Sequence, residues 1–294
     1  MHRSGFVNII GNPNVGKSTL MNALTGERLS AVTAKAQTTR HRIMGIISGE
    51  DYQIVFSDTP GIIKPKYKMQ EGMMDFVRTA FTDADVIVYV TDVVETPDKN
   101  ALYIDKISTM DVPVLLVINK IDLSAPEKLD ELSDLWKSLL PSAIVIPASA
   151  KEKFNVETLR AAIQKVLPEG PAYYPKDELS DKPERFFASE ILRGKIFENY
   201  DKEIPYCSEV VVELFKERSN IIHISTVIFI ERDTQKSIII GKKGAALKRT
   251  ATQARKEMER FFGKKIFLET FVKVRKDWRN DERYLKNFGY INRI

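Results

Sequence analysis

Residues 11–18 of this chain read Gly-Asn-Pro-Asn-Val-Gly-Lys-Ser, with two glycines, a lysine and a hydroxyl at a fixed spacing. Glycines at the first and sixth positions let a loop bend so that several backbone N–H groups point at one anion. Lys17 can reach the outer phosphates of a nucleotide, and the Ser18 hydroxyl can be a ligand of Mg²⁺. The pattern therefore favours the binding of a nucleoside polyphosphate together with its metal ion.

The loop lies between an apolar run at 5–10, which predicts a buried strand, and a helical pattern near 17–25. This context suits phosphate binding, because a helix N-terminus adds partial positive charge beside the loop. A chance glycine turn is the alternative, and the strand and helix on its two sides make it the poorer one. The predicted phosphate-binding residues are Gly11, Asn12, Pro13, Asn14, Val15, Gly16, Lys17, Ser18 and Thr19.

Asn119-Lys120-Ile121-Asp122 follows an apolar run at 113–118 and resembles the N-K-x-D box of GTPases. The Asp122 carboxylate can accept hydrogen bonds from the N1–H and 2-amino groups of guanine, donors that adenine lacks. We expect Asn119 and Lys120 to brace this loop and cover the base. A stretch at the end of the next strand resembles the last guanine-contacting box, although small residues after strands are common. The predicted guanine-binding residues are Asn119, Lys120, Asp122, Ser149, Ala150 and Lys151.

Asp58-Thr59-Pro60-Gly61 closes an apolar run at 52–57. Asp58 is placed to hold Mg²⁺ through a water molecule, and the Gly61 N–H can approach the γ-phosphate. A threonine upstream can complete the magnesium shell when the γ-phosphate is present. Spacing does not separate Thr38 from Thr39, whereas position in the GTPase pattern favours Thr39. The predicted metal ligands are Ser18, Thr39 and Asp58, the predicted catalytic residues are Lys17, Thr39, Asp58 and Gly61, and Thr59 and Pro60 complete the nucleotide site.

The elements that must position these residues alternate between strand and helix over residues 1–170. This alternation predicts an α/β domain with a mostly parallel sheet and helices on both faces. Strands are expected at 5–10, 42–48, 52–57, 85–90, 113–118 and 143–148, with 42–48 and 52–57 forming a hairpin around Gly49-Glu50-Asp51. Helices are expected near 17–25, 70–82, 97–109, 126–140 and 155–167.

A proline-rich stretch interrupts the alternation and predicts a linker over 171–183. Residues 184–294 then follow a different order. A helix is expected at 184–199, strands at 208–216 and 222–232, helices on either side of a turn within 236–262, and a strand at 266–274. The second part of the chain is therefore expected to be a separate α+β domain with a C-terminal tail.

Residues 238–247 read Ile-Ile-Ile-Gly-Lys-Lys-Gly-Ala-Ala-Leu and resemble the core of KH domains, whose GXXG loop clamps about four nucleotides. With the surrounding element order, this resemblance predicts a type II KH domain. A plain helix–turn–helix cap is the alternative for the glycines alone. Leu247, Ala251, Ala254, Met258 and Phe261 recur at helical spacing and predict a core stripe, with Lys248, Arg249, Arg255 and Lys256 outside it. The predicted RNA-binding residues are Gly241, Lys242, Lys243, Gly244, Lys248 and Arg249.

Charge is unevenly spread along the chain. The whole chain carries a net charge of +5, and residues 241–294 alone hold 16 lysines and arginines against six acidic residues. This asymmetry indicates a polyanionic partner for the basic half, which can be an RNA or an anionic lipid surface. The two glycines of the turn favour RNA, because attraction to lipid needs no GXXG loop.

The motifs together resemble the Era family of bacterial GTPases. They are Gly-Asn-Pro-Asn-Val-Gly-Lys-Ser-Thr, Lys-Ala-Gln-Thr-Thr-Arg-His-Arg, Asp-Thr-Pro-Gly, Asn-Lys-Ile-Asp, Ile-Gly-Lys-Lys-Gly and a final Phe-Gly-Tyr, in the family's order over nearly the whole chain. The resemblance implies GTP hydrolysis with Mg²⁺, binding of the 3′ region of 16S ribosomal RNA and assistance in 30S subunit assembly. It also implies a cytoplasmic protein, expected to be a monomer, with contact to inner-membrane lipid in some members.

Ras-like GTPases carry a glutamine two residues after the glycine of the D-x-x-G motif, where this chain has Ile63, preceded by Ile62. Neither isoleucine can hold a water molecule. The chain resembles the subgroup of GTPases with a hydrophobic residue at this position, so intrinsic hydrolysis is expected to be slow. Two rival interpretations are an RNA clamp gated by the nucleotide and a regulatory GTPase at the membrane surface.

Composition excludes several other classes of protein. Cys207 is the only cysteine, which rules out an intramolecular disulfide, and we interpret it as a small core residue rather than a reactive thiol. No apolar run reaches the roughly 18 residues that a membrane span needs. The N-terminus begins directly with a strand-like Gly-Phe-Val-Asn-Ile-Ile, and we expect no signal peptide. The aromatic tail at 278–290 can either stack bases or fasten a C-terminal helix.

Overall fold

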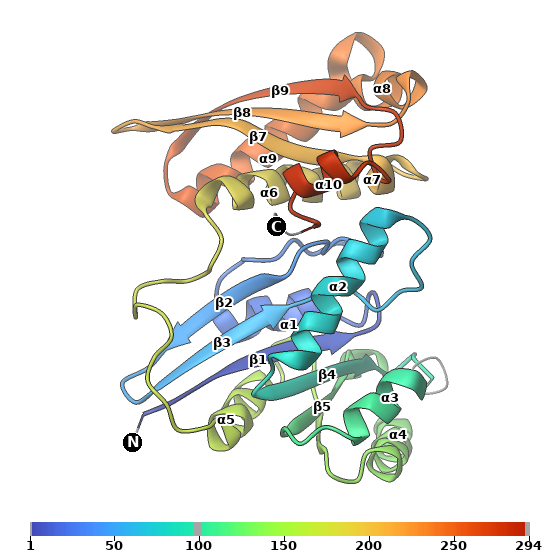
Figure 1. Cartoon of the computed structure of the whole chain (residues 1–294), viewed down its shortest axis with the longest axis vertical. Coiled ribbons are helices and arrows are strands. Elements are labelled where there is room, and N and C mark those ends of the chain that lie inside the picture. Colours follow the sequence, from blue (N-terminus) through green and yellow to red (C-terminus); the bar gives the residue numbers. More distant parts are fainter. Residues whose placement is uncertain (1, 97–100, 292–294) are drawn as a thin grey trace. The chain divides into compact units, whose positions relative to one another are not determined.

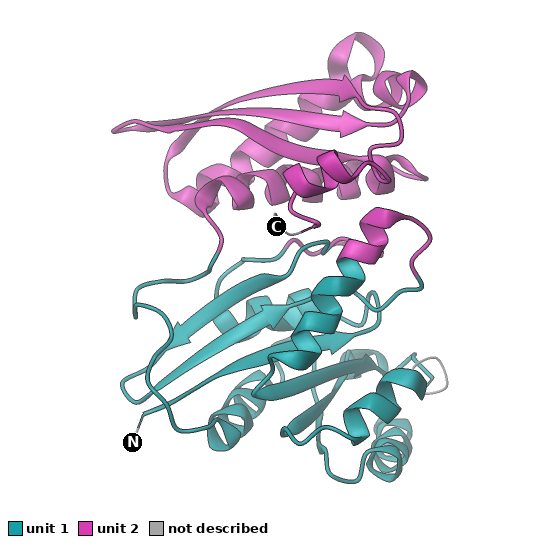
Figure 2. Ribbon diagram, viewed as in Figure 1, with its two compact units in different colours: residues 1–30, 39–64, 73–181 teal, residues 31–38, 65–72, 182–294 magenta. Residues whose placement is uncertain are grey.

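The computed structural model of the chain describes residues 2–96 and 101–291 (Figure 1). Contacts group these residues into two compact units, which Figure 2 shows in different colours. Unit 1 comprises residues 1–30, 39–64 and 73–181, and unit 2 comprises residues 31–38, 65–72 and 182–294. Two short segments from the first part of the sequence therefore group with the C-terminal unit.

Unit 1 is built on a six-stranded sheet with the order β2-β3-β1-β4-β5-β6. Its strands are β1 (Arg3–Gly11), β2 (Ile43–Ser48), β3 (Tyr52–Asp58), β4 (Val86–Asp92), β5 (Val114–Asn119) and β6 (Ile144–Pro147). Only β2 runs antiparallel to its neighbour, and all other pairs are parallel. The central strands are buried along their whole length, as expected when helices cover both faces of a sheet.

Helices lie on both faces of this sheet; Figure 1 shows α2 in front of the strands and α1 behind them. The helices of unit 1 are α1 (Lys17–Thr25), α2 (Lys68–Thr82), α3 (Ala101–Ser108), α4 (Pro126–Leu139) and α5 (Val156–Val166), with a short η2 (Ile121–Leu123), and the first turn of α2 groups with unit 2. The predicted α/β class is thus confirmed. Of the helix predicted at 97–109, residues 97–100 lie outside the described residues.

The proline-rich stretch after α5 is held against the sheet, although its sequence predicts only a linker. The Gln53 side chain accepts hydrogen bonds from the backbone N–H groups of Tyr173 (2.7 Å) and Tyr174 (2.9 Å) and donates one to the Tyr174 carbonyl (2.8 Å). Further along, the Ile46 N–H of β2 donates to the Leu179 carbonyl at 2.9 Å. The stretch thereby covers part of the sheet edge that β2 would otherwise expose.

Unit 2 contains a three-stranded sheet with the order β7-β8-β9, in which β7 is antiparallel and β9 parallel to β8. Its strands are β7 (Glu209–Glu217), β8 (Ile221–Ile230) and β9 (Lys265–Val274), and its helices are α6 (Glu184–Asn199), α7 (Ile204–Cys207), α8 (Asp233–Ile240), α9 (Ala245–Phe262) and α10 (Glu282–Asn287), with η3 (Lys242–Gly244) between α8 and α9. The predicted α+β order is therefore confirmed.

The core of unit 2 lies between the sheet and helices α6, α8 and α9. Ala254 and Met258 of α9 are fully buried in it, as the helical stripe predicts, while Leu247, Ala251 and Phe261 are half-buried. Lys248, Arg249 and Lys256 are exposed, and Arg255 is half-buried and pairs with Glu259 at 2.7 Å.

The aromatic tail is fastened to unit 2. Trp278 is fully buried and donates from its indole nitrogen to the Cys207 carbonyl at 3.0 Å, and the buried Tyr290 hydroxyl donates to Glu209 at 2.5 Å. Because Trp278 and Tyr290 are both buried in the protein, neither side chain is available to stack on RNA bases. Cys207 itself is buried, as expected for a core residue. Over the described ranges, no helix has the length and apolar character needed to cross a membrane.

Candidate functional site

The phosphate loop connects the end of β1 to the start of α1, as the motif requires. Lys17 opens α1 and is buried by its surroundings, with only 6% of its surface exposed. Its Nζ donates to the Asn12 carbonyl at 2.8 Å, so the ammonium is turned back over the loop. Burial lowers the pKa of Lys17 to about 8, against the opposing influence of the Asp58 and Glu95 carboxylates. A phosphate dianion would supply the counter-charge that this buried lysine needs.

Gly16 immediately precedes α1 and has a left-handed backbone with φ of 97°. A Cβ atom at this position would collide with the Asn119 amide, so the loop needs glycine there for space as well as for conformation. Asn119 donates from Nδ2 to the Val15 carbonyl at 2.8 Å and accepts from the Ala150 N–H at 3.0 Å. One buried side chain thus connects the phosphate loop to both predicted guanine-binding stretches.

Lys120 follows Asn119 and also reaches the phosphate loop. Its Nζ donates to the Asn14 carbonyl at 2.5 Å and pairs with the Asp92 carboxylate at 2.7 Å. Asn119 and Lys120 therefore make the bracing contacts that the sequence predicts.

The Asp122 carboxylate lies on the exposed side of η2 and accepts a hydrogen bond from the Ser149 hydroxyl at 2.6 Å. The same hydroxyl accepts from the Glu152 N–H at 3.2 Å, which shapes the turn after β6. The Lys151 side chain forms an ion pair with the Glu152 carboxylate at 3.2 Å. The two guanine-binding stretches, distant in sequence, are thus joined at the carboxylate that would read the base.

The three predicted metal ligands lie together. Ser18 Oγ is 2.8 Å from Thr39 Oγ1, and Thr39 donates to Asp58 Oδ2 at 3.3 Å. Asp58 is fully buried, and within the described residues its Oδ1 atom has no hydrogen-bond partner. Burial raises the pKa of the Asp58 carboxyl, opposed by Lys17, Ser18 and Thr39 among its neighbours. Oxygen donors beside a buried, under-satisfied carboxylate fit Mg²⁺ with its retained water molecules.

Thr38 points elsewhere, although it precedes Thr39 in the chain. Its hydroxyl is 2.5 Å from that of Thr33 and donates to the Lys35 carbonyl at 2.7 Å. These bonds fold the 31–38 segment on itself and leave Thr39 as the threonine beside Ser18.

The Asp58-Thr59-Pro60-Gly61 motif closes over the phosphate loop. Thr59 is buried and donates to the Ile9 carbonyl at 2.9 Å, while a Cβ atom on Gly61 would clash with Pro13. The next N–H, of Ile62, donates to the Gly11 carbonyl at 3.2 Å. Ile62 and Ile63 are both half-buried, and their side chains carry no polar atom that could orient water.

Sequence reasoning missed two acidic residues at the carboxyl end of β4, Asp92 as its last residue and Glu95 just after it. Asp92 is buried and pairs with Lys120, and Glu95 accepts hydrogen bonds from the Asn12 amide and, at 2.9 Å, from Thr91. Both brace the loops around the nucleotide site. Their position at the carboxyl end of a parallel strand, the same sheet edge as the phosphate loop, is a signal that could have found them.

The predicted RNA-binding loop joins α8 to α9 in unit 2. Gly241 has a φ of 71°, and a Cβ atom there would collide with Ala246. Lys243 also adopts a left-handed backbone, with φ of 51°, and Gly244 at 78° precedes the first residue of α9. Lys242 and Lys243 lie within this turn, Lys248 and Arg249 lie in the first turns of α9, and all four cations are exposed. An 18-residue helix that begins at such a turn presents free N–H groups beside these cations, which suits a phosphate backbone.

Comparison with known proteins matches both halves of the chain. Residues 6–120 match the family described as 50S ribosome-binding GTPase, and residues 203–279 match the KH domain family. GTPase Era of Geobacter sp. (strain M21) is 47% identical over 290 residues, which cover 98% of each chain. The chain belongs to the GTPase Era family. The chloroplastic GTPase ERA1 of Zea mays is 46% identical over 298 residues, which cover 100% of this chain and 72% of the plant protein.

Two solved structures of this family match over nearly the whole chain, both with a TM-score of 0.94 and 37% identity. One is Era in complex with MgGDPNP and nucleotides 1506–1542 of 16S ribosomal RNA, with 99% of both chains covered. The other is an Aquifex aeolicus Era variant bound to GDP·AlF₄⁻, with 98% of this chain and 99% of that chain covered. The resemblance inferred from the motifs is thereby confirmed, together with the pairing of a P-loop GTPase domain and a KH domain.

Proposed function

We propose that this chain binds and hydrolyses GTP at the site of unit 1 and binds the 3′ region of 16S ribosomal RNA through its KH domain, in support of 30S subunit assembly. The observation that carries the proposal is the pairing, in one chain, of a braced phosphate loop with an exposed Gly-Lys-Lys-Gly turn at the start of a long helix. Family relatives hold MgGDPNP and 16S RNA, or GDP·AlF₄⁻.

In the nucleotide site, the residues 11–19 surround the phosphates and Lys17 neutralises the outer ones. Ser18, Thr39 and Asp58 would hold Mg²⁺, directly or through water, and the ion would supply positive charge against the phosphates. The Gly61 N–H approaches the γ-phosphate. Asp122 reads guanine, while Asn119, Lys120 and the 149–151 turn hold the base and the loop in place.

Hydrolysis in this proposal is slow without a partner. Ile62 and Ile63 occupy the place where a polar side chain would orient the attacking water. The backbone, an ion or a partner must position that water instead, so we assign no residue as the general base. Lys17 stabilises the charge that develops on the phosphates.

In the KH domain, Gly241 and Gly244 allow the RNA backbone to approach, and Lys242, Lys243, Lys248 and Arg249 neutralise its phosphates. We place the GTPase domain at residues 1–170, the linker at 171–183 and the KH domain with its tail at 184–294. The protein in this proposal acts as a monomer in the cytoplasm.

An RNA cross-linking experiment tests the proposal. The full chain, loaded with GTP or GDP, is mixed with total RNA, cross-linked and purified, and the attached RNA is sequenced. Enrichment of the 16S 3′ region on peptides from residues 236–262 is expected. Enrichment of unrelated RNA, or of none, contradicts the RNA part of the proposal, and the same preparation tests GTP turnover independently.

Contact with anionic inner-membrane lipid is a second candidate function, supported by the excess of 16 basic over six acidic residues in 241–294. The glycine turn favours RNA, since a lipid surface does not need close approach of the backbone. Sedimentation of the protein with anionic vesicles, with and without competing RNA, separates the two.

A further inference from the structure

The three-stranded sheet of unit 2 has one face packed on helices and one face that is partly open. Even-numbered residues of β8, such as Ile222, Ile224 and Ile228, belong to the core, so the odd-numbered ones point to the other side. By strand register, one row across that side is Lys216, His223 and Phe267, and another ends at Phe271. We call the side that carries Leu214, His223, Phe267 and Phe271 the open face.

Large apolar side chains stand exposed on the open face. Phe267 and Phe271 of β9 are 48% and 52% exposed, and Leu214 of β7 is 48% exposed. His223 lies beside Phe267, with ring centroids 5.3 Å apart. Isolated exposed apolar residues need no explanation, but two phenylalanines on the same side of one strand form a patch.

The C-terminal segment covers another part of this side of the sheet. Phe229, on the same side of β8 as His223, packs against Phe288 and Tyr284 with centroids 5.3 and 6.2 Å apart. Phe229 is consequently only 9% exposed, in contrast to the two phenylalanines of β9. The C-terminal segment thus covers Phe229 and leaves Phe267 and Phe271 accessible.

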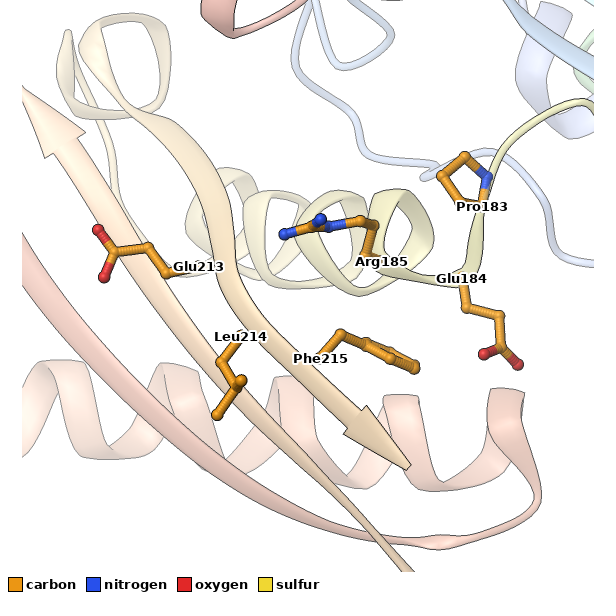
Figure 3. Close-up of a pocket in the computed structure, with 6 residues that line it drawn as sticks. All are labelled: Pro183, Glu184, Arg185, Glu213, Leu214 and Phe215. Atoms are coloured by element: carbon orange, nitrogen blue, oxygen red, sulfur yellow. The ribbon is translucent and has the colours of Figure 1, made fainter. Parts of the chain in front are cut away.

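Basic side chains flank the two phenylalanines on the open face. On β9, Lys265 and Lys273 flank the phenylalanines, two residues before Phe267 and two after Phe271, and both lysines are at least partly exposed. At the β7 edge, next to the start of α6, lies a pocket of about 360 Å³; Figure 3 labels the residues that line it. It is lined by Pro183, Glu184, Arg185, Glu213, Leu214 and Phe215. The lining carries two carboxylates and one guanidinium, and Glu213 pairs with Lys273 of β9 at 2.9 Å.

Strand β9 connects the open face to the Gly-Lys-Lys-Gly turn. It is an edge strand of the sheet, and helices α8 and α9, which flank the turn, both pack against it. Its inward residues, such as Ile266, face the helices, while Phe267 and Phe271 face the opposite side. A nucleic-acid strand that crossed the β9 edge from the turn would pass onto the side of the sheet that carries the two phenylalanines.

We propose that the open face along β9 is a second RNA contact, on which unpaired bases of the same RNA stack on Phe267 and Phe271. This inference rests on the proposed RNA-binding function. A GXXG loop clamps about four nucleotides. The RNA bound to the family relative runs from nucleotide 1506 to 1542, so most of its nucleotides lie outside such a clamp and can contact other parts of the domain. Exposed aromatic rings stack bases of any sequence, and Lys265 can neutralise a neighbouring phosphate.

Glu269 lies between the two phenylalanines on the same side of β9. A carboxylate there repels phosphates but accepts hydrogen bonds from the amino group of a base such as cytosine. The bases, rather than the backbone, must therefore face this part of the strand. That orientation is the one that stacking on Phe267 and Phe271 requires.

The test compares two RNAs and two variants of the full chain. The long RNA is the 16S segment 1506–1542, and the short RNA is the shortest fragment of it that still binds the unaltered protein. The double variant Phe267→Thr, Phe271→Thr should weaken binding of the long RNA about 25-fold or more, because each of the two stacked bases contributes roughly a factor of five or more. Binding of the short RNA should be unchanged. Leu214→Thr, at a site of similar exposure on β7, is the matched control and should leave binding of both RNAs unchanged.

Equal binding of the long RNA by the double variant overturns the inference and assigns the patch to a different partner, such as a protein. An equal reduction in binding of the long RNA by Leu214→Thr also overturns the inference, because the loss of affinity would then not be specific to the phenylalanines of β9. Failure of the unaltered protein to bind either RNA contradicts the proposed function instead. If the double variant does not fold, iodouridine cross-linking of the long RNA to the unaltered protein decides: cross-links on Phe267 or Phe271 support the inference, and their absence there contradicts it.

Discussion

The hydroxyl oxygens of Ser18 and Thr39 lie 2.8 Å apart, although the two residues are 21 positions apart in sequence. Thr39 also donates to Asp58, so two hydroxyls and a buried carboxylate converge on one point beside the phosphate loop. The hydroxyl of Thr38 bonds instead within its own segment, to Thr33 and Lys35. This geometry distinguishes two threonines that spacing alone leaves equivalent.

Thr39→Ala should weaken the Mg²⁺-dependent binding of a non-hydrolysable GTP analogue while leaving GDP binding nearly unchanged. One oxygen ligand is removed only in the triphosphate state, at a cost of about 1–3 kcal/mol, or roughly five- to 150-fold in affinity. Thr38→Ala is the matched control and should retain the affinity of the unaltered protein. Magnesium titrations of fluorescent nucleotide binding provide the measurement. The assignment is wrong if the two variants behave in the opposite order.

Asp122→Asn should weaken GTP binding and shift preference toward xanthine nucleotides. Guanine donates hydrogen bonds from N1 and its 2-amino group, whereas xanthine has an acceptor oxygen at C2 that an amide can donate to. The reduction for GTP should be at least about 1–3 kcal/mol, because the bound base would cover residue 122 and leave donor groups of guanine without an acceptor. Competition binding with GTP and xanthosine triphosphate measures it. A variant that keeps full GTP affinity and still rejects xanthosine triphosphate would show that Asp122 does not read the base.

Ile63→Ala should change intrinsic GTP hydrolysis only modestly, since the isoleucine contributes no polar chemistry. Lys17→Ala, in contrast, should abolish nucleotide binding or turnover, because in the proposed site this buried ammonium neutralises the outer phosphates. Single-turnover phosphate release, with circular dichroism to verify folding, measures both. A fall of several orders of magnitude in folded Ile63→Ala would mean that this side chain has a catalytic role that its chemistry does not suggest.

The sequence predicts the architecture well because its strongest signals are local. Buried parallel strands such as β4 and β5 are continuous apolar runs, and helix α9 carries an apolar stripe at helical spacing. The glycines of the phosphate loop are specified by backbone conformation and lie within eight residues. Each of these features can be read without knowing what lies beside it.

Contacts between distant parts of the sequence could not be predicted in the same way. Nothing in the spacing says that Gln53 holds the backbone at 173–174, or that Glu95 reaches Asn12. Both contacts depend on which strands become neighbours and on side-chain rotamers chosen by packing. The 31–38 and 65–72 segments likewise group with unit 2, which their local sequence does not indicate.

Replacement of Lys242 and Lys243 by aspartate should sharply reduce binding of single-stranded RNA. Both lysines lie at the solvent-facing turn between α8 and α9, so the substitutions add repulsion at the RNA without removing packing. Replacement by alanine should weaken binding less. It should also flatten the dependence of binding on salt, because the slope falls by about 0.7 for each single-strand phosphate that the protein no longer neutralises. Filter binding or fluorescence anisotropy at several salt concentrations measures both effects.

The glycines decide how such a result is interpreted. Gly241 and Gly244 remain in both variants, so the turn keeps the left-handed backbone that lets a phosphate chain approach. A change in affinity then reports charge at the turn, provided that the melting curve is unaltered. GTP turnover without RNA should be the same in both variants, because the residues of the nucleotide site all lie in the other half of the sequence. Unchanged RNA binding by the aspartate variant would contradict the assignment of this turn as the RNA clamp, and the basic surface of residues 241–294 would then be better explained by anionic lipid.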